Sequence, residues 1–112
     1  MGKYTYMVLG IAKPGREHDY RRWYAEHHIK DVFAQPGVTS ARLLAVDSVT
    51  GVGIDLPQYS TLAAYELEVD DIQSALSGIR RKAGTDEMQM SDAAERTGSI
   101  HLILREIVSE QT

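Results

Sequence analysis

The chain has 112 residues, of which 43% are apolar and 25% charged, and this balance is typical of a folded globular domain. Its formal charge of −4 gives no reason to expect nucleic acid as a partner, and the lack of cysteine excludes disulfides, thiolate catalysis and cysteine-based metal sites. No apolar stretch approaches the ~18 residues that span a membrane. We therefore expect one domain over residues 1–112 in a reducing, cytoplasmic setting, without nucleic-acid or membrane partners and with a frayed tail at 109–112.

The first half of the chain predicts a strand, a helix and a second strand. Residues 3–12 are rich in β-branched and aromatic residues and are followed by Pro14-Gly15, which is typical of a strand. From Glu17 to Ala34 there is no Gly or Pro, and aromatic residues and His27 recur at helical spacing. Pro36-Gly37 ends this helix, and a strand follows over 38–47.

The second half predicts a strand, a helix and a last strand, separated by two loops. An aspartate supplies the N-cap of the second helix, and apolar residues recur on one face of it. The predicted segments are a loop over 48–57, a strand over 58–69, a helix from Asp70 or Asp71 to about Lys82, a loop with at most one helical turn over 85–97, and a strand over 99–108.

This order of elements is the ferredoxin-like βαββαβ pattern. It predicts an α+β fold, in which two helices cover one face of a four-stranded antiparallel sheet. The other face of the sheet is also rich in apolar residues and needs a cover. Because two-fold dimers are the commonest oligomers, we expect a homodimer in which the two sheets pack on each other.

One segment of about twenty residues is distinctive. It contains Trp23-Tyr24, His27-His28, Pro36-Gly37 and Ala41-Arg42. This pattern resembles the dimeric α+β-barrel superfamily, and within it the ethyl tert-butyl ether degradation (EthD-like) group. The resemblance implies a pocket between the sheet and the helices, and it matches the group's usual histidine to His28. The superfamily includes cofactor-free monooxygenases, cyclases, isomerases, decarboxylases and haem-degrading enzymes, so it does not define one reaction.

The two adjacent histidines cannot point the same way, because neighbouring helix positions lie about 100° apart. We expect one of them to enter the pocket, where a neutral imidazole can act as general acid or base on an enolisable substrate. His28 is the first candidate and His27 the second; each could instead bond Glu26, Asp31 or a backbone carbonyl. No metal site is expected, since the pair lacks the i, i+4 spacing of helical zinc ligands.

Two further side chains are candidates for contacts with a substrate. Tyr24 could donate a hydrogen bond to a developing oxyanion, as a second catalytic residue. Arg42 could bind a substrate carboxylate; the alternatives are an ion pair with Glu66 or Glu68 and an interface contact. Strand alternation predicts that Arg42 lies on the face of Val38, Ser40 and Leu44.

Other candidates for ligand binding are aromatic or flexible. Each of the aromatic candidates has core packing as its alternative role. Met88 and Met90 could contact a ligand from a flexible loop. The aromatic candidates are Trp23, Tyr6, Tyr65 and His101.

These features predict an enzyme of the lyase, isomerase or cyclase type that works without a cofactor on a small carbonyl, aromatic or polyketide-like compound, in catabolism or secondary metabolism. The alternatives are a non-catalytic dimer that binds a small molecule or stabilises a partner, and a cofactor-free monooxygenase or a haem-binding protein with a histidine as axial ligand.

Overall fold

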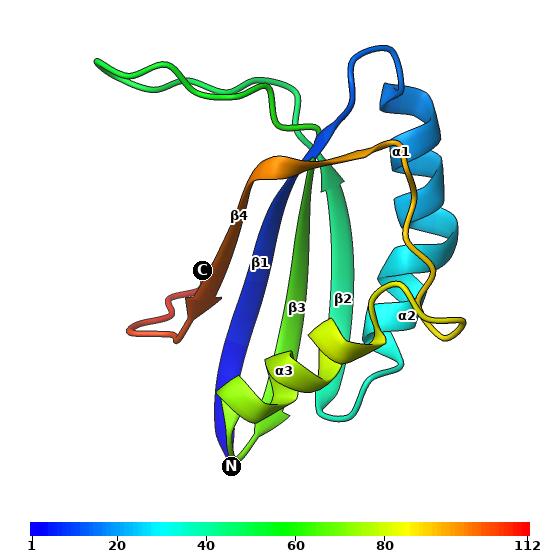
Figure 1. The fold of residues 1–112 in the computed structure, drawn as a ribbon. Helices are drawn as coiled ribbons and strands as arrows, with labels where there is room; N and C mark the ends of the chain where they lie inside the picture. Colours follow the sequence, from blue (N-terminus) through cyan, green and yellow to red (C-terminus); the bar gives the residue numbers. More distant parts are fainter.

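The computed structural model of the chain describes residues 1–112 and contains one four-stranded antiparallel sheet with helices on one side (Figure 1). The strand order is β2-β3-β1-β4, which confirms the ferredoxin-like prediction. The elements are β1 (Gly2–Ala12), α1 (Glu17–Trp23), the π-helical turn η1 (Tyr24–His28), α2 (Ile29–Phe33), β2 (Val38–Ala45), β3 (Thr61–Val69), α3 (Ile72–Lys82) and β4 (Ala94–Leu104).

The pairing of the strands decides which side chains face the helices. Tyr6 at the middle of β1 pairs with Tyr65 on β3 and with Ile103 on β4, so these three side chains lie on the same face. The helices bring Tyr20 and Tyr24 against this face, and both are buried. The core between the helices and the sheet is therefore unusually rich in tyrosine, whose hydroxyl groups need partners when they are buried.

The predicted first helix is helical throughout its length except for the last residue, but it is not uniform. Its middle turn is π-helical: the N–H of Ile29 donates to the carbonyl of Tyr24, five residues earlier instead of four. A wider turn brings residues five apart onto one side of the helix. In this chain those residues are Trp23 and His28.

The second helix begins and ends as predicted. The Asp71 carboxylate accepts hydrogen bonds from the backbone N–H groups of Gln73 and Ser74, which makes it the N-cap of α3. Leu76 and Ile79 are buried against the sheet. The chain then leaves the helix through Gly84, whose φ of +87° is readily accessible to glycine.

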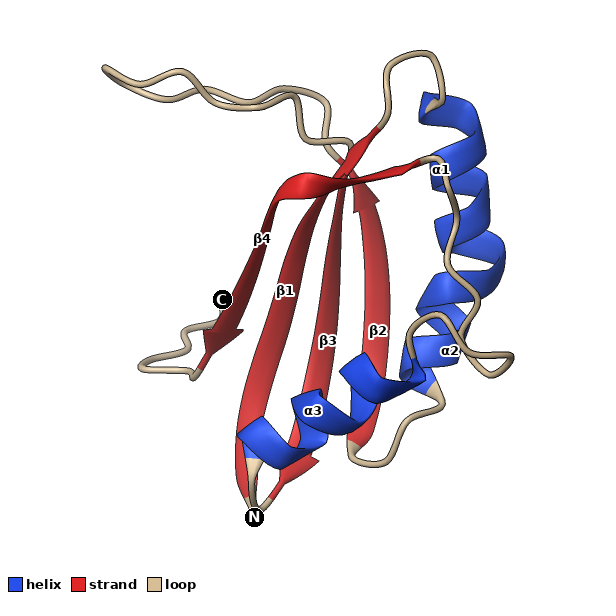
Figure 2. Cartoon of the chain, viewed as in Figure 1, coloured by secondary structure: helices blue, strands red, loops and turns tan.

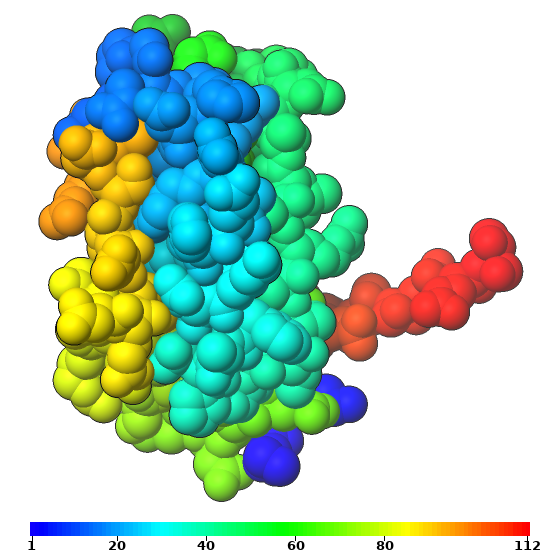
Figure 3. Space-filling model, turned by 90° about the vertical axis from the view of Figure 1, so that its right-hand side faces the viewer, coloured from blue at the N-terminus to red at the C-terminus, as the bar shows by residue number.

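The last strand differs from the prediction at both ends. It begins at Ala94, where Ala94 and Glu95 pair with the end of β1, and it ends at Leu104. A bulge between these first pairs and the rest of the strand, with Gly98 at a φ of +90°, lets one strand include both parts. Residues 105–112 form no strand and stand clear of the body of the molecule (Figure 3).

The segment between β2 and β3 is longer than predicted. β2 ends at Ala45 and β3 begins at Thr61, and the intervening residues 46–60 reach out beyond the sheet as a long loop (Figure 2). None of the helices is long and apolar enough to cross a membrane.

The sheet face opposite the helices is apolar and uncovered. Leu9 pairs with Leu62 and Ile100, and Met7 pairs with Leu102, so these five side chains share this face. Ile100 and Leu102 are 37% and 42% exposed. The structure thus has the second apolar face that the alternating sequence pattern indicated.

Candidate active site

A pocket of about 440 Å³ lies between the sheet and the first helix. Five parts of the chain build its walls: β1, the helix from Tyr20 to His28, the turn Ala83-Gly84 after α3, the segment around Met90, and β4 from Ala94 to His101. The floor and the helix wall are mostly apolar or aromatic, while β4 contributes the charged and polar groups. An apolar cavity with a few convergent polar groups is the usual form of a small-molecule site.

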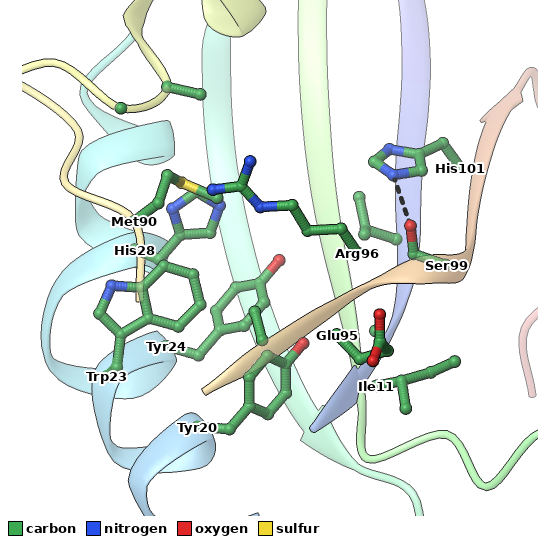
Figure 4. Close-up of a pocket in the computed structure, with 15 residues that line it drawn as sticks. Ile11, Tyr20, Trp23, Tyr24, His28, Met90, Glu95, Arg96, Ser99 and His101 are labelled. Atoms are coloured by element: carbon green, nitrogen blue, oxygen red, sulfur yellow. Dashed lines mark hydrogen bonds between the residues drawn. The ribbon is translucent and has the colours of Figure 1, made fainter. Parts of the chain in front are cut away.

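His28 is held in the helix wall by two aromatic rings. Its ring stacks on Trp23 with a centroid distance of 4.7 Å and an interplanar angle of 21°, and it meets Tyr24 edge-on at 4.9 Å. The Nδ1 atom is enclosed and has no hydrogen-bond partner, whereas Nε2 is not enclosed. Because His28 lines the pocket, we take Nε2 as the nitrogen that a ligand can reach (Figure 4).

The surroundings of His28 keep its imidazole neutral. Burial lowers the pKa of His28 to about 4, and the nearby carboxylate of Asp31 opposes this shift without cancelling it. A neutral imidazole with one accessible nitrogen can accept a proton near pH 7.

His27 lies elsewhere. Its side chain is exposed and lines a separate, polar depression with Asp31, Asp86 and Asp92. No group of histidine and acidic residues in the chain has an arrangement that could hold a metal ion. The structure therefore brings only one of the two adjacent imidazoles to the pocket.

The hydroxyl of Tyr24 is engaged in the core. It lies 3.3 Å from the Tyr65 hydroxyl, and burial raises the pKa of both phenols. Tyr65 itself is almost fully buried and is not part of the pocket wall. Tyr24 thus presents its ring to His28, while its hydroxyl already has a partner.

A second imidazole, His101, lines the pocket from β4. The Tyr6 hydroxyl lies 2.6 Å from its Nδ1 atom. Ser99 Oγ lies 3.4 Å from its Nε2 atom (Figure 4). Burial raises the pKa of Tyr6, so this hydroxyl is protonated and can donate a hydrogen bond to Nδ1, its one partner. Burial and the positive charge of Arg80 lower the pKa of His101. In the tautomer that accepts from Tyr6, the neutral ring carries its own proton on Nε2, where it can donate a hydrogen bond to a ligand.

Arg42 is not in the pocket. Arg42 pairs with Ala64 of β3, and its side chain is exposed on the face of the sheet opposite the helices. It shares this face with Leu44, but not with Val38, because a register shift separates Val38 from Ser40. The ion pairs expected with Glu66 or Glu68 are also absent. A role for Arg42 in binding a pocket ligand within one protomer does not fit this position.

The remaining candidates divide between wall and core. Trp23 has two roles: its ring lines the pocket, and its indole N–H holds the following segment by donating to the carbonyl of Gln89 at 3.1 Å. Met90 lines the pocket and is 37% exposed, but Met88 is completely buried and cannot be a mobile contact. Tyr6 acts behind His101 and does not line the pocket.

Three polar residues of the pocket were not predicted from the sequence. Glu95, Arg96 and Ser99 lie at the start of β4, in or beside the stretch interpreted as a loop. The only signal in the sequence is the nearby Gly98, which is compatible with a bulged strand. A single glycine does not predict that residues 94 and 95 pair with the end of β1.

Comparison with known proteins supports the fold. No protein-family model and no curated protein sequence matches the chain. Among solved structures, it is similar to a "putative monooxygenase" from Shewanella loihica PV-4, with a TM-score of 0.61 and 16% identity over 96% of this chain and 97% of that one. It is also similar to an EthD family protein from Bacillus halodurans C-125, with a TM-score of 0.58 and 16% identity over 94% and 99%. The resemblance to the EthD-like group thus holds at the level of the fold.

Proposed function

We propose that the chain is a cofactor-independent enzyme that moves a proton next to the carbonyl group of a small, largely apolar compound. The observation that carries this proposal is the environment of His28: a neutral imidazole, fixed by Trp23 and Tyr24, with Nε2 open to an apolar pocket. Fixed orientation and exclusion of water are the conditions in which a general base works well. The reaction class would be that of a lyase, isomerase or cyclase.

The proposed step uses two imidazoles on different walls of the pocket. Nε2 of His28 accepts the proton from the carbon next to the carbonyl, and the electron pair of that C–H bond forms the enolate. The enolate oxygen accepts a hydrogen bond from Nε2–H of His101, which Tyr6 fixes in this tautomer. The imidazolium at His28 then returns its proton to carbon or to a leaving group. His101 takes the role that the sequence suggested for Tyr24.

The experiment needs no knowledge of the natural substrate. The compound 3-benzoylpropanoate has a phenyl ring and an enolisable ketone, and proton NMR in D2O follows the replacement of its α-hydrogens by deuterium. The protein should accelerate this exchange over buffer, and His28→Gln should lower the enzymatic rate by a factor on the order of 100. His27→Gln is the matched control and should keep the full rate. An equal rate for wild type and His28→Gln would refute the role of His28.

Oxygenation without a cofactor is the second candidate reaction. The apolar pocket favours it, and so does the similarity in fold to the "putative monooxygenase" from Shewanella loihica PV-4. An oxygen electrode distinguishes the two, because proton transfer alone consumes no oxygen. A non-catalytic binder would show saturable binding without exchange or oxygen uptake. Haem binding stays an expectation from the sequence, and an absorption spectrum after haem addition tests it.

We further propose that the working form is a homodimer that covers the open face of the sheet. This face carries Met7, Leu9, Leu62, Ile100 and Leu102, and contiguous apolar surface of this kind is typical of an interface. A second copy presents the same surface and can match it through a two-fold axis. Sedimentation velocity of the wild-type protein measures the state directly.

A further inference from the structure

We propose that the pocket takes a substrate that carries a carboxylate, and that Arg96 binds this group at the β4 side. The inference rests on the proposed function in one respect, since it assigns a substrate class to the same pocket. It is based on different residues, however, because it depends on Arg96 of β4 and not on His28 of the helix.

Arg96 is a guanidinium without a partner at the edge of an apolar cavity. It lines the pocket but takes part in no ion pair and no side-chain hydrogen bond. The arginines of the first helix region differ, because Arg16, Arg21 and Arg22 each bind a carboxylate. In the view of Figure 4, the Arg96 side chain extends from β4 toward the wall that carries His28 and Met90.

The protein supplies little negative charge to balance Arg96. Glu95 is the one carboxylate of the pocket wall, and its Oε1 accepts a hydrogen bond from the backbone N–H of Thr97. A second cation, Arg80, acts on both Tyr6 and His101 and also has no ion-pair partner. The two imidazoles of the pocket are neutral. Arg80 belongs to α3 and does not line the pocket, so Arg96 is the one permanent cation of the wall, and Glu95 forms no ion pair with it.

The other side of the cavity has a different character. Trp23 and Met90 offer aromatic and apolar surface with no free charge. A ligand that matches both sides has an apolar, preferably aromatic body and an anionic end. A carboxylate is the anion that the planar guanidinium binds through two parallel hydrogen bonds. The reacting carbonyl would lie between these ends, within reach of His28 and His101.

A binding experiment tests this with two probes that differ only in charge. The probes are 3-phenylpropanoate and 3-phenylpropanamide, and the readout is the fluorescence of Trp23, the single tryptophan, which lies in the pocket wall. Excitation at the red edge of the indole band avoids absorption by the phenyl ring. We expect the acid to bind at least about tenfold more tightly than the amide near pH 7.

Arg96→Gln should remove this preference, mainly by weakening the binding of the acid. Arg42→Gln is the matched control: it removes the same charge from the opposite face of the sheet and should leave both affinities unchanged. Equal binding of the two probes, no binding of the acid, or the same loss in both arginine variants would overturn the proposal. Neither probe carries a ketone, so no turnover enters the result. Equal binding of the two probes by the wild-type protein, together with intact proton exchange at His28, would therefore reject the carboxylate alone.

Discussion

Trp23 and His28 stack on each other although they are five residues apart in one helix. In a regular α-helix, such residues point in clearly different directions. The π-helical turn Tyr24–His28 adds one residue to the turn and brings the two rings together. Turns of this kind occur frequently at functional sites. The geometry of the candidate base is thus a property of the backbone as well as of the side chains.

The pH dependence of stability should report the burial of His28. Its pKa is lowered in the folded state, so the unfolded chain binds the proton first as the pH falls. The contribution of His28 is complete above pH 6.5 and is lost between pH 6.5 and about 4, amounting to up to roughly 3 kcal/mol. The carboxylate of Asp31, from α2, raises the pKa of His28 and so limits the loss of stability. The other ionisable groups near His28 in the pocket wall are Tyr24 and Arg96 of β4.

Urea unfolding of wild type and His28→Gln across this range provides the test of that contribution. The difference between their free energies of unfolding should shrink as the pH falls, because the variant has no imidazole to protonate at this position. His27→Gln, whose side chain is exposed, should keep the wild-type pH dependence. A difference between wild type and His28→Gln that stays constant with pH would contradict the buried, neutral state.

Tyr6→Phe should slow proton exchange while the fold is preserved. The phenyl ring keeps the stacking on Tyr65, whose centroid lies 6.0 Å away, but His101 Nδ1 loses its donor. The ring of His101 is then free to carry its proton on either nitrogen, and we expect a rate about tenfold lower with a loss of stability near 1 kcal/mol. Combined with His101→Gln, the effect of Tyr6→Phe should disappear, because Tyr6 acts through His101.

The control for this prediction is Tyr4→Phe, on the same strand and the same face. The Tyr4 hydroxyl makes no hydrogen bond, so its removal should leave the exchange rate unchanged. Full additivity of Tyr6→Phe and His101→Gln would show that the two residues act independently.

Gly10→Ala should destabilise the protein, because the added methyl group overlaps with the hydroxyl of Tyr20. Tyr20 cannot move away easily: it is 3% exposed, and its hydroxyl lies 3.1 Å from Thr61 Oγ1. We expect a loss of about 1–3 kcal/mol, measured by chemical denaturation.

Gly78→Ala provides the comparison, since its methyl group would meet only Arg81 Nη2 at 3.7 Å. Gly78 lies inside α3, where alanine is favoured over glycine by about 0.5–1 kcal/mol. The two substitutions should therefore have opposite signs. Stabilisation by Gly10→Ala would show that Tyr20 is not fixed against β1.

Leu102→Glu should break the proposed dimer. Leu102 lies on the open face of the sheet, and a carboxylate there would be buried without a partner on association. Sedimentation velocity should show a dimer for the wild type and a monomer for this variant. Phe33→Glu changes a similarly exposed apolar residue at the end of α2 and should remain dimeric. A monomeric wild type would leave the open face without its proposed cover.

Local sequence signals predicted much of the fold. Alternating strands, the glycine-free stretch from Glu17 and the Asp71 cap are short-range features, and each lies where the sequence placed it. The start of β4 depends instead on pairing between Ala94 and Ala12, which are far apart in the chain. That pairing also brings Arg96 to the pocket. Because it is a long-range contact, neither the start of the strand nor the position of Arg96 could be predicted from the local sequence.

The side on which a residue lies was predictable only where the strands are regular. The positions of Tyr6, Tyr65 and His101 on one face follow from simple alternation. Arg42 is different, because a register shift follows Val38. As a result, Val38 lies on the helix side of the sheet and Arg42 on the opposite side. The π-helical turn has no clear sequence signature either, although it decides how His28 meets Trp23.

The most direct test of His28 as the base of the pocket is nitrogen-15 NMR of its side chain, assigned by comparison with His28→Gln, in a pH titration with and without 3-benzoylpropanoate. We expect an imidazole that stays neutral down to about pH 4 in the free protein, with an Nε2 resonance that shifts when the compound binds. A ring that is already protonated at pH 6, or an Nε2 resonance that ignores a bound ligand, would contradict the assignment of His28 as the base of this pocket.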